Sequence, residues 1–177
     1  MRLFIAVNFS DEIKTRILAL QEELRSRVLR GSFTRPENLH LTLAFLGETS
    51  ADRLEDLFRI IERVQSPPFK IRFTRTGCYT HSRKELWWIG MDSKSPELPL
   101  LRSINTQLSG SLINESFPVD TRPFNAHITL GREIKHTDPI IMDDPDIAVN
   151  VNRISLMESK RVRGLLTYTE LFGKKLD

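Results

Sequence analysis

Two histidines of this chain occupy equivalent positions in a repeated segment. Residues 34–43 read TRPENLHLTL and residues 121–130 read TRPFNAHITL, so seven of ten positions are identical at an offset of 87 residues. The chain has four histidines, and this repeat contains two of them, His40 and His127, each followed two residues later by a threonine. Two imidazoles placed opposite each other could act as acid and base on one substrate near neutral pH.

Each copy of the repeat has the pattern of a β-strand, because apolar and polar residues alternate along it. His40 and Thr42 therefore share one face of the first strand, and His127 and Thr129 share one face of the second. Residues two apart on a strand lie roughly 6.5–7 Å from each other. An imidazole and a hydroxyl at that spacing can both reach a single phosphate group.

The two halves of the chain also repeat the elements that would position these strands. In the first half, residues 3–8 read as a buried strand that is too short to span a membrane. A helix is expected next, with Ser10 as its N-cap and Gly31 at its end. The apolar stripe of this helix consists of Ile13, Ile17, Leu20, Leu24 and Val28.

In the second half, residues 86–91 read as the equivalent strand, and the same offset aligns Leu3 with Gly90. The second helix is expected to begin at Ser95, with Pro96 at its first helical position. Its apolar stripe consists of Leu98, Leu101, Ile104, Leu108 and Leu112. Each half therefore reads as strand, helix and motif strand.

The two halves diverge after the motif strands. The first half continues into a helix that ends before Pro67, with its apolar face formed by Leu54, Leu57, Phe58, Ile61 and Val64. In the second half Pro139 and Pro145 break the equivalent region, which reads as an irregular segment. Residues 69–75 alternate and are expected to pair with residues 86–91 across a loop.

These elements predict the fold class. Two late strands are expected near residues 148–158 and 165–172. Short helices mixed with strands that are joined by hairpins indicate an α+β fold with antiparallel sheets. The simplest architecture is a single bilobal domain spanning residues 1–177. Its two similar lobes of sheet with flanking helices would be related by a pseudo-twofold axis, with His40 and His127 facing each other across a central groove.

Composition limits the class of protein. Hydrophobic residues make up 40% of the 177 residues, which is enough for a core, and the formal net charge is +3 with a pI of about 9.2. This mild basicity permits a polyanionic partner. A single cysteine, Cys78, excludes an internal disulfide and favours a reducing compartment. We therefore expect a cytoplasmic monomer with no membrane segment.

The repeated motif resembles the signature of the 2H phosphoesterase superfamily, and within it the RNA 2′,3′-cyclic phosphodiesterase (2′-5′ RNA ligase-like) branch. The resemblance rests on the opening MRLFIAV, on PENLHLTLAFLG around His40, and on RPFNAHITLGR around His127. The pair Trp87–Trp88 and the late segment Met157-Glu158-Ser159 fit as well, so the resemblance covers almost the whole chain. A single His-x-Thr means little, but two copies in paired contexts are a strong signal.

The resemblance implies a mechanism that needs neither metal nor cofactor. In it, His40 is the proton donor to the departing 3′ oxygen, and His127 is the proton acceptor that activates water. Thr42 and Thr129 bind the phosphate oxygens, and Arg132 is the arginine that the family usually carries at this position. The implied substrate and partner is RNA with a 2′,3′-cyclic phosphate end, and the implied product is a 2′-phosphomonoester.

Arg132 poses a problem of strand parity. In an unbroken strand it would lie on the core face with Ile128 and Leu130. A bulge at Gly131 could turn it back toward the histidines. Otherwise Arg132 is a partly exposed residue at the end of a strand.

Other residues have weaker claims to a binding role. Arg35 and Arg122 flank the two motifs and either bind RNA phosphates or form surface salt bridges. The basic residues 160–163 either contact the RNA backbone or form a solvated hairpin tip. His81 and His136 read as surface loop residues without repeat partners. One ring of the Trp87–Trp88 pair is expected to be buried, and Phe9 and Phe45 are expected in the core.

Three alternatives to this function stay open. The same residues could serve a phosphodiesterase acting on small cyclic nucleotides or 2′-5′-linked oligonucleotides, or the reverse joining of RNA ends. A non-catalytic protein could use the histidines to bind RNA ends, although the intact His and Thr in both copies argue against it. In a metal-dependent phosphoesterase His40 and His127 would be ligands, but they need at least one more ligand, and no acidic residue shares their strand face.

Overall fold

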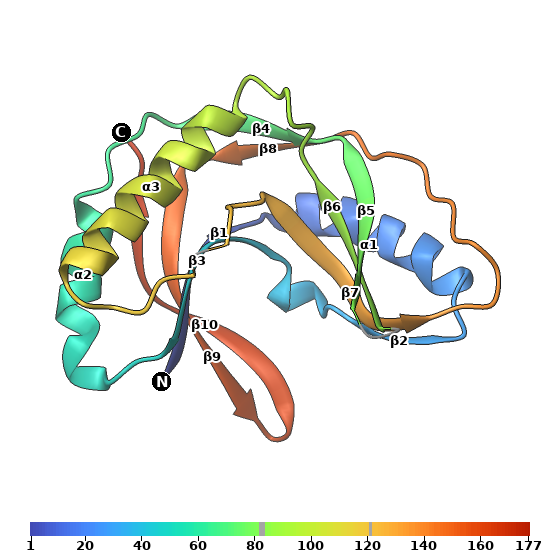
Figure 1. Ribbon diagram of the computed structural model, residues 1–177, viewed down its shortest axis with the longest axis horizontal. Helices are drawn as coiled ribbons and strands as arrows, with labels where there is room; N and C mark the ends of the chain where they lie inside the picture. Colours follow the sequence, from blue (N-terminus) through green and yellow to red (C-terminus); the bar gives the residue numbers. More distant parts are fainter. Residues whose placement is uncertain (82–83, 121) are drawn as a thin grey trace.

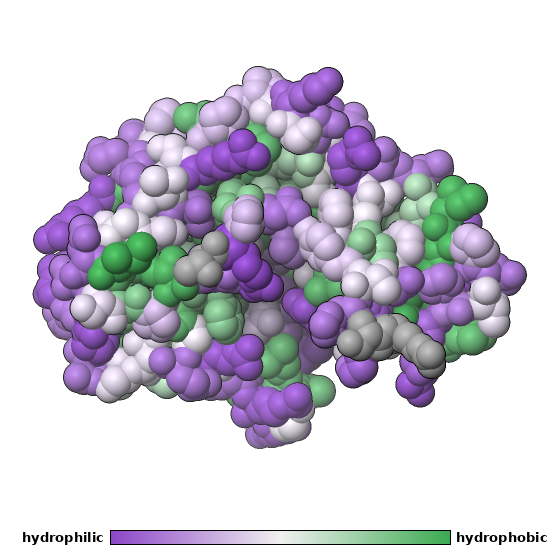
Figure 2. Space-filling model, viewed as in Figure 1, coloured by the Kyte–Doolittle hydropathy of each residue, from purple (hydrophilic) through white to green (hydrophobic). Residues whose placement is uncertain are grey.

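The computed structural model describes residues 1–81, 84–120 and 122–177. Arg83 of the predicted hairpin loop and Thr121, which opens the second copy of the repeat, lie outside the described residues. Two four-stranded antiparallel sheets form two lobes, and a small two-stranded sheet joins them along one side (Figure 1). Figure 2 shows that the same face of the molecule is hollowed between the lobes.

The first lobe is built on the sheet that contains the first motif. Its strand order is β10-β9-β1-β3, with every neighbouring pair antiparallel. These strands are β1 (Arg2–Asn8), β3 (His40–Glu48), β9 (Arg153–Val162) and β10 (Leu165–Lys175). β1 is buried along most of its length, as its apolar sequence predicts.

The second lobe is built on the sheet that contains the second motif, with strand order β2-β7-β6-β5. Its strands are β2 (Arg30–Phe33), β5 (Arg75–His81), β6 (Lys84–Gly90) and β7 (His127–Lys135). The small sheet pairs β4 (Phe69–Phe73) with β8 (Ile147–Val151). The first motif strand β3 and the second motif strand β7 contact each other where the two lobes meet.

The helices pack across the repeat. They are α1 (Asp11–Ser26), α2 (Leu54–Glu62) and α3 (Leu98–Asn114), with short 3₁₀ turns at Pro36–Asn38 and Ala51–Arg53. α1 follows β1 of the first sheet but contacts β2 and β7 of the second, whereas α3 follows β6 of the second sheet and contacts β3 of the first. The two halves are therefore interlocked, because each half places its helix on the sheet of the other.

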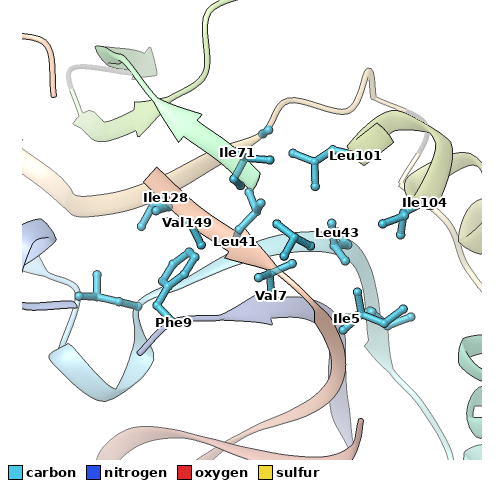
Figure 3. Packing of buried hydrophobic residues seen from close by; sticks show 14 of the residues in the cluster. Ile5, Val7, Phe9, Leu41, Leu43, Ile71, Leu101, Ile104, Ile128 and Val149 are labelled. Atoms are coloured by element: carbon cyan, nitrogen blue, oxygen red, sulfur yellow. The ribbon is translucent and has the colours of Figure 1, made fainter. Parts of the chain in front are cut away.

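One hydrophobic cluster runs through both lobes. Ile5 and Val7 of β1 and Leu41 and Leu43 of β3 lie in it together with Ile128 of β7 (Figure 3). Leu41, Leu43 and Ile128 are the apolar positions that alternate with the motif histidines and threonines. Because the main hydrophobic core is shared by both lobes, we propose that residues 1–177 form one bilobal domain. Within the described residues no helix is long and apolar enough to cross a membrane.

The structure corrects the predicted offset of the first strands. Asn8 pairs with His40, and Gly90 pairs with His127, so Asn8 rather than Leu3 is the equivalent of Gly90. The helices still begin 87 residues apart, at Asp11 and Leu98. The loop before α3 is therefore longer than the loop before α1, and an alignment at one constant offset misplaces β6.

Two predicted helix ends were also wrong. α1 ends at Ser26 because the N–H of Arg27 bonds the carbonyl of Leu24 and the chain then turns to pair with β7. Gly31 lies in β2, where a Cβ would displace the tip of the Ile134 side chain, and so it does not end the helix. α3 begins at Leu98 because Ser95 and Pro96 are part of two turns that precede it.

The predicted strand at residues 69–75 is divided between two sheets. Residues up to Phe73 form β4, which pairs with β8, and β5 from Arg75 onward is the strand that pairs with β6. Likewise, the predicted strand at residues 148–158 is two strands, β8 and β9. The irregular segment predicted around Pro139 and Pro145 is confirmed, since residues 136–146 contain neither helix nor strand.

Candidate active site

The two motif histidines open onto one groove. His40 begins β3 and His127 begins β7, and both line a hollow of about 230 Å³. Thr42, Thr129 and Arg132 line the same hollow. The structure thus brings together all five residues that the sequence nominated for the site.

A backbone carbonyl fixes each imidazole in the same way. Nδ1 of His40 lies 2.7 Å from the carbonyl oxygen of Asn38, and Nδ1 of His127 lies 2.9 Å from that of Asn125. A carbonyl oxygen can only accept, so Nδ1 carries the proton in both rings and Nε2 is the atom available for chemistry. The two rings are therefore held in the same tautomer by equivalent residues of the repeat, the asparagines two positions before each histidine.

The asparagines that supply these carbonyls are themselves anchored. The Asn38 side chain donates to the Leu166 carbonyl of β10 at 2.9 Å, and the Asn125 side chain donates to the Tyr79 hydroxyl of β5. Each anchor is an edge strand of the sheet that carries the histidine. Sequence reasoning missed this role, although the asparagine is present in both copies of the repeat.

The threonines of the two motifs differ in their contacts. The Thr42 hydroxyl lies 2.9 Å from Nε2 of His40, where it donates to the neutral ring. The Thr129 hydroxyl instead accepts a long bond of 3.5 Å from Arg132 Nη2. The site is therefore pseudo-symmetric in backbone but asymmetric in charge, with the guanidinium on the Thr129 side.

A register shift in β7 explains the position of Arg132. Trp87 pairs with Gly131 and Trp88 pairs with Thr129, so one residue of β7 is extra at this point. Gly131 is buried with Phe33 and Ile134 close to where its Cβ would be, and Arg132 is exposed on the groove side. The bulge thus reverses the parity that an unbroken strand would give.

Aromatic rings flank both histidines and affect their protonation. His40 contacts Phe4 and Tyr168 with ring centroids 4.7 and 5.3 Å away, and His127 lies 6.0 Å from Tyr79 and 6.5 Å from Trp88. Burial lowers the pKa of both imidazoles below the ordinary value. The backbone carbonyls raise the pKa values in part, and the positive charge of Arg132 lowers them again.

Two further polar residues join the motifs to each other. The side chain of Gln21 in α1 is buried and donates to the Thr34 carbonyl at 2.7 Å and to the Leu130 carbonyl at 2.8 Å. The Thr34 hydroxyl donates to the Thr129 carbonyl at 2.8 Å. These bonds connect the approach to the first motif with the strand of the second, and so fix the spacing across the groove. The sequence analysis did not single out Gln21.

The other basic candidates are only loosely connected with the groove. Arg35 lines it but forms an ion pair with Glu37 and donates to the Leu166 carbonyl. Arg122 lines a second hollow that adjoins the groove, and it is paired with Asp120 at 2.5 Å. Both arginines are thus held by local acceptors.

The remaining candidates divide between core and surface. Trp87 is buried, as predicted for one ring of its pair. Phe45 is 42% exposed, so its assignment to the core was wrong. His136 is not a free surface residue, since Nε2 lies 3.0 Å from Glu85 Oε2. Within the described part of the chain no cluster of three or more His, Cys, Asp or Glu side chains could hold a metal ion.

Comparison with known proteins places this geometry in a family. Residues 7–88 match the LigT-like phosphoesterases. The RNA 2′,3′-cyclic phosphodiesterase of Archaeoglobus fulgidus is 33% identical over 144 residues, which cover 81% of this chain and 78% of the relative. That of Escherichia coli is 32% identical over 173 residues, covering 96% and 93%. The chain belongs to the LigT-like phosphoesterase family.

Solved structures show that this LigT-like phosphoesterase also shares the fold of its relatives. Escherichia coli LigT complexed with 3′-AMP matches with a TM-score of 0.85 at 29% identity, over 99% of this chain and 97% of that one. A protein of Thermus thermophilus matches with a TM-score of 0.80 at 27% identity, over 99% and 98%. The predicted α+β fold of two antiparallel sheets with flanking helices is thereby confirmed.

Proposed function

We propose that this LigT-like phosphoesterase hydrolyses RNA 2′,3′-cyclic phosphate ends to 2′-phosphomonoesters, with His40 as the acid and His127 as the base. The observation that supports the proposal is the matched pair of imidazoles. Both have Nδ1 bonded to a carbonyl and both open onto one groove with Thr42, Thr129 and Arg132. The relatives named RNA 2′,3′-cyclic phosphodiesterase supply the substrate class.

The reaction follows from in-line displacement at phosphorus. Nε2 of His127 removes a proton from water as the water oxygen bonds to phosphorus. The bond from phosphorus to the 3′ oxygen breaks, and Nε2 of His40 gives its proton to that oxygen. The product carries a phosphomonoester on the 2′ oxygen and a free 3′ hydroxyl. Proton exchange with solvent then restores both histidines.

The threonines and the arginine act on the non-bridging phosphate oxygens. Negative charge grows on these oxygens as the fifth bond to phosphorus forms, and fixed donors in a partly dry site stabilise that charge. Arg132 and Thr129 lie together on one side of the groove and Thr42 lies beside His40. A phosphate held between them keeps water and the 3′ oxygen on opposite sides.

Substrate charge also prepares the acid. In the free protein burial and Arg132 hold the pKa of His40 below its ordinary value, which disfavours the imidazolium needed as proton donor. The phosphodiester brings a negative charge that offsets Arg132 and favours the protonated ring. Binding of the cyclic phosphate and protonation of His40 therefore favour each other.

This reasoning predicts two different pH profiles. The profile of kcat/KM reports the free enzyme, whose histidine pKa values are both lowered. Both limbs of this profile should therefore lie at lower pH than two histidines of ordinary pKa would give, so the bell should be centred below about 6.5. The bell of kcat should lie at higher pH, because bound phosphate raises the same pKa values. Coincident bells, or a kcat/KM bell centred well above neutral pH, would contradict this account of the site.

The proposed function predicts turnover that survives EDTA and a single product isomer. RNA ending in a 2′,3′-cyclic phosphate is incubated with the purified protein, with and without EDTA, and the product is identified by phosphorus NMR. We expect equal rates and a 2′-phosphate. RNA ending in a 3′-phosphate serves as the unreactive control. Loss of activity in EDTA would favour the metal-dependent alternative, and a 3′-phosphate product would reverse the roles of the two ribose oxygens.

The geometry also favours reverse joining of RNA ends as a second candidate. Beyond His127 the groove continues into a second hollow of about 520 Å³ that shares Thr42, His127 and Arg132 with the first. A 5′ hydroxyl entering from that side could take the place of water beside His127. Its attack with departure of the 3′ oxygen would give a 2′-5′ linkage. Incubation of a cyclic-phosphate RNA with a 5′-hydroxyl RNA at high concentration, followed by gel analysis, tests this.

A further inference from the structure

The hairpin formed by β9 and β10 extends beyond the body of the molecule. In Figure 1 it projects below the two lobes, past the N-terminus, and in Figure 2 its end is a largely hydrophilic protrusion. The strands reach Val162 and Leu165 and are joined by Arg163 and Gly164, which both have positive φ angles of 50° and 82°. A two-residue turn of this kind matches the twist of the strands. The hairpin is therefore an ordered arm.

The outer part of this arm carries positive charge. Lys160, Arg161 and Arg163 lie in it, and the sequence from residue 159 to 169 contains no aspartate or glutamate. Glu158, at the base, is paired with Lys160 at 3.0 Å. The Arg161 side chain donates to the Gly164 carbonyl, so its guanidinium keeps other donors for a ligand. Such a surface attracts a polyanion.

The register of the hairpin connects this charge with the groove. Leu166 and Tyr168 line the groove, and Tyr168 packs edge-on against His40. Arg161 is paired with Leu166, and Ser159 is paired with Tyr168, so these residues share the groove face of the arm. Residues two apart on a strand are separated by roughly 7 Å. The arm thus continues the groove floor outward from His40.

The proposed reaction sets the direction in which RNA leaves the site. Water at His127 and the 3′ oxygen at His40 lie on opposite sides of phosphorus, so the ribose lies on the His40 side. The RNA strand that precedes this ribose then emerges over the sheet that carries His40. On that sheet β1 lies beside the strand of His40, followed by β9 and then β10. The Tyr168 ring of β10 reaches back to pack against His40.

We propose that the β9–β10 arm is an RNA-binding surface that holds the strand on the 5′ side of the cyclic phosphate. Leu166 and Tyr168 contact the terminal nucleosides, and Arg161, with Arg163 in the turn, contacts backbone phosphates farther out. Lys160 lies on the opposite face of the arm and adds only to its positive potential. The inference rests on the proposed function, because that function fixes the side on which the ribose lies. An arm that binds the preceding RNA strand would make the enzyme prefer RNA ends to single cyclic nucleotides.

Charge favours RNA over a protein partner as the occupant. Val162 and Leu165 are 42% and 54% exposed, but they are paired with each other and lie on the face opposite Arg161 and Leu166. The face that continues the groove combines arginine with Tyr168 and Leu166, a combination suited to phosphates and to ribose or base surfaces. Self-association through the apolar pair remains an outcome of the test.

The test compares two substrates in one charge-removal variant. Lys160→Gln, Arg161→Gln and Arg163→Gln are combined, and kcat/KM is measured on a 2′,3′-cyclic mononucleotide and on an RNA of about eight nucleotides with the same end. We expect loss on the order of tenfold or more on the RNA, no change on the mononucleotide, and a salt slope shallower by about 0.7 for each lost phosphate contact. The matched control removes equal charge at the distant exposed positions Arg63, Lys70 and Lys175.

The outcomes separate the arm from the active site. Wild-type protein inactive on both substrates would overturn the proposed function and with it this inference. A wild-type enzyme that treats both substrates alike, or a variant that loses both activities equally, would overturn the arm alone. So would a wild-type dimer that becomes monomeric in the variant, measured by sedimentation, because the arm would then be a contact between copies. Unchanged RNA turnover in the variant would show a merely solvated hairpin tip.

Discussion

Replacing His127 by alanine should lower kcat/KM on RNA cyclic phosphate ends on the order of 10²–10⁴-fold, and replacing His40 should have a similar effect. Each variant removes one of two proton-transfer groups while Thr42, Thr129 and Arg132 remain to bind the phosphate. The loss should appear mainly in kcat, because binding of the ground state depends little on either imidazole. Steady-state kinetics with a defined RNA end measures it.

The double variant and a surface histidine control this experiment. His40→Ala combined with His127→Ala should lose less than the product of the single losses, because acid and base act as a unit. His81→Ala removes an exposed imidazole at the end of β5 and should leave the rate unchanged. A His127→Ala protein with full activity would end its assignment as the base, and full activity in both single variants would show that the catalytic groups are residues other than these two histidines.

Replacing Arg132 by glutamine should lower kcat/KM on the order of 10²–10³-fold, the usual cost of removing one donor to a developing oxyanion. It should also change the pH profile. Arg132 lowers the pKa of both His40 and His127 in the free protein. Removing its charge raises both values, so both limbs of the kcat/KM bell should move to higher pH.

Arg132→Lys distinguishes the charge of this residue from its shape. Lysine keeps the positive charge, so the bell should stay near its wild-type position, but it loses the planar pair of donors and should not restore the full rate. A merely structural arginine would change the rate without shifting the limbs. An Arg132→Gln bell that stays in place would therefore contradict the role of this side chain at the histidines.

The motif strands could be predicted because their pattern is local. Alternation around His40 and His127 sets which side chains share a face, and the duplicated context indicates that the two faces meet. The same strands contribute Leu41, Leu43 and Ile128 to the buried core, so one pattern specified both packing and site. Burial of one ring of the Trp87–Trp88 pair was also expected, and Trp87 is the buried one.

The errors arose where tertiary contacts overrule local pattern. Gly31 reads as a helix stop, yet it lies in β2 with the tip of the Ile134 side chain close to where its Cβ would be. The crossing of α1 and α3 onto opposite sheets leaves no trace in periodicity, because each helix shows the same apolar stripe whichever sheet it covers. Apolar periodicity also does not indicate the length of the loop before α3. An alignment at a constant offset therefore misplaced the first strands.

Some features of the site depend on backbone atoms that the sequence does not specify. The carbonyls of Asn38 and Asn125 fix the tautomers through main-chain atoms, which any residue carries. The sequence indicates that Arg132 reaches the histidines only if β7 has a bulge near Gly131. The position of that bulge is set by the pairing of β7 with β6. The bonds from Gln21 join segments far apart in sequence.

The most direct test of the paired roles uses a substrate with sulfur in place of the 3′ oxygen. A thiolate leaves without being protonated, since a free thiol has a pKa of only about 8.5. On the 3′-sulfur cyclic phosphate, His40→Ala should recover to within about tenfold of the wild-type rate, whereas His127→Ala should stay lower on the order of 10²–10⁴-fold. Rescue of His127→Ala instead, or equal defects on both substrates, would contradict the assignment of His40 as the acid that protonates the 3′ oxygen.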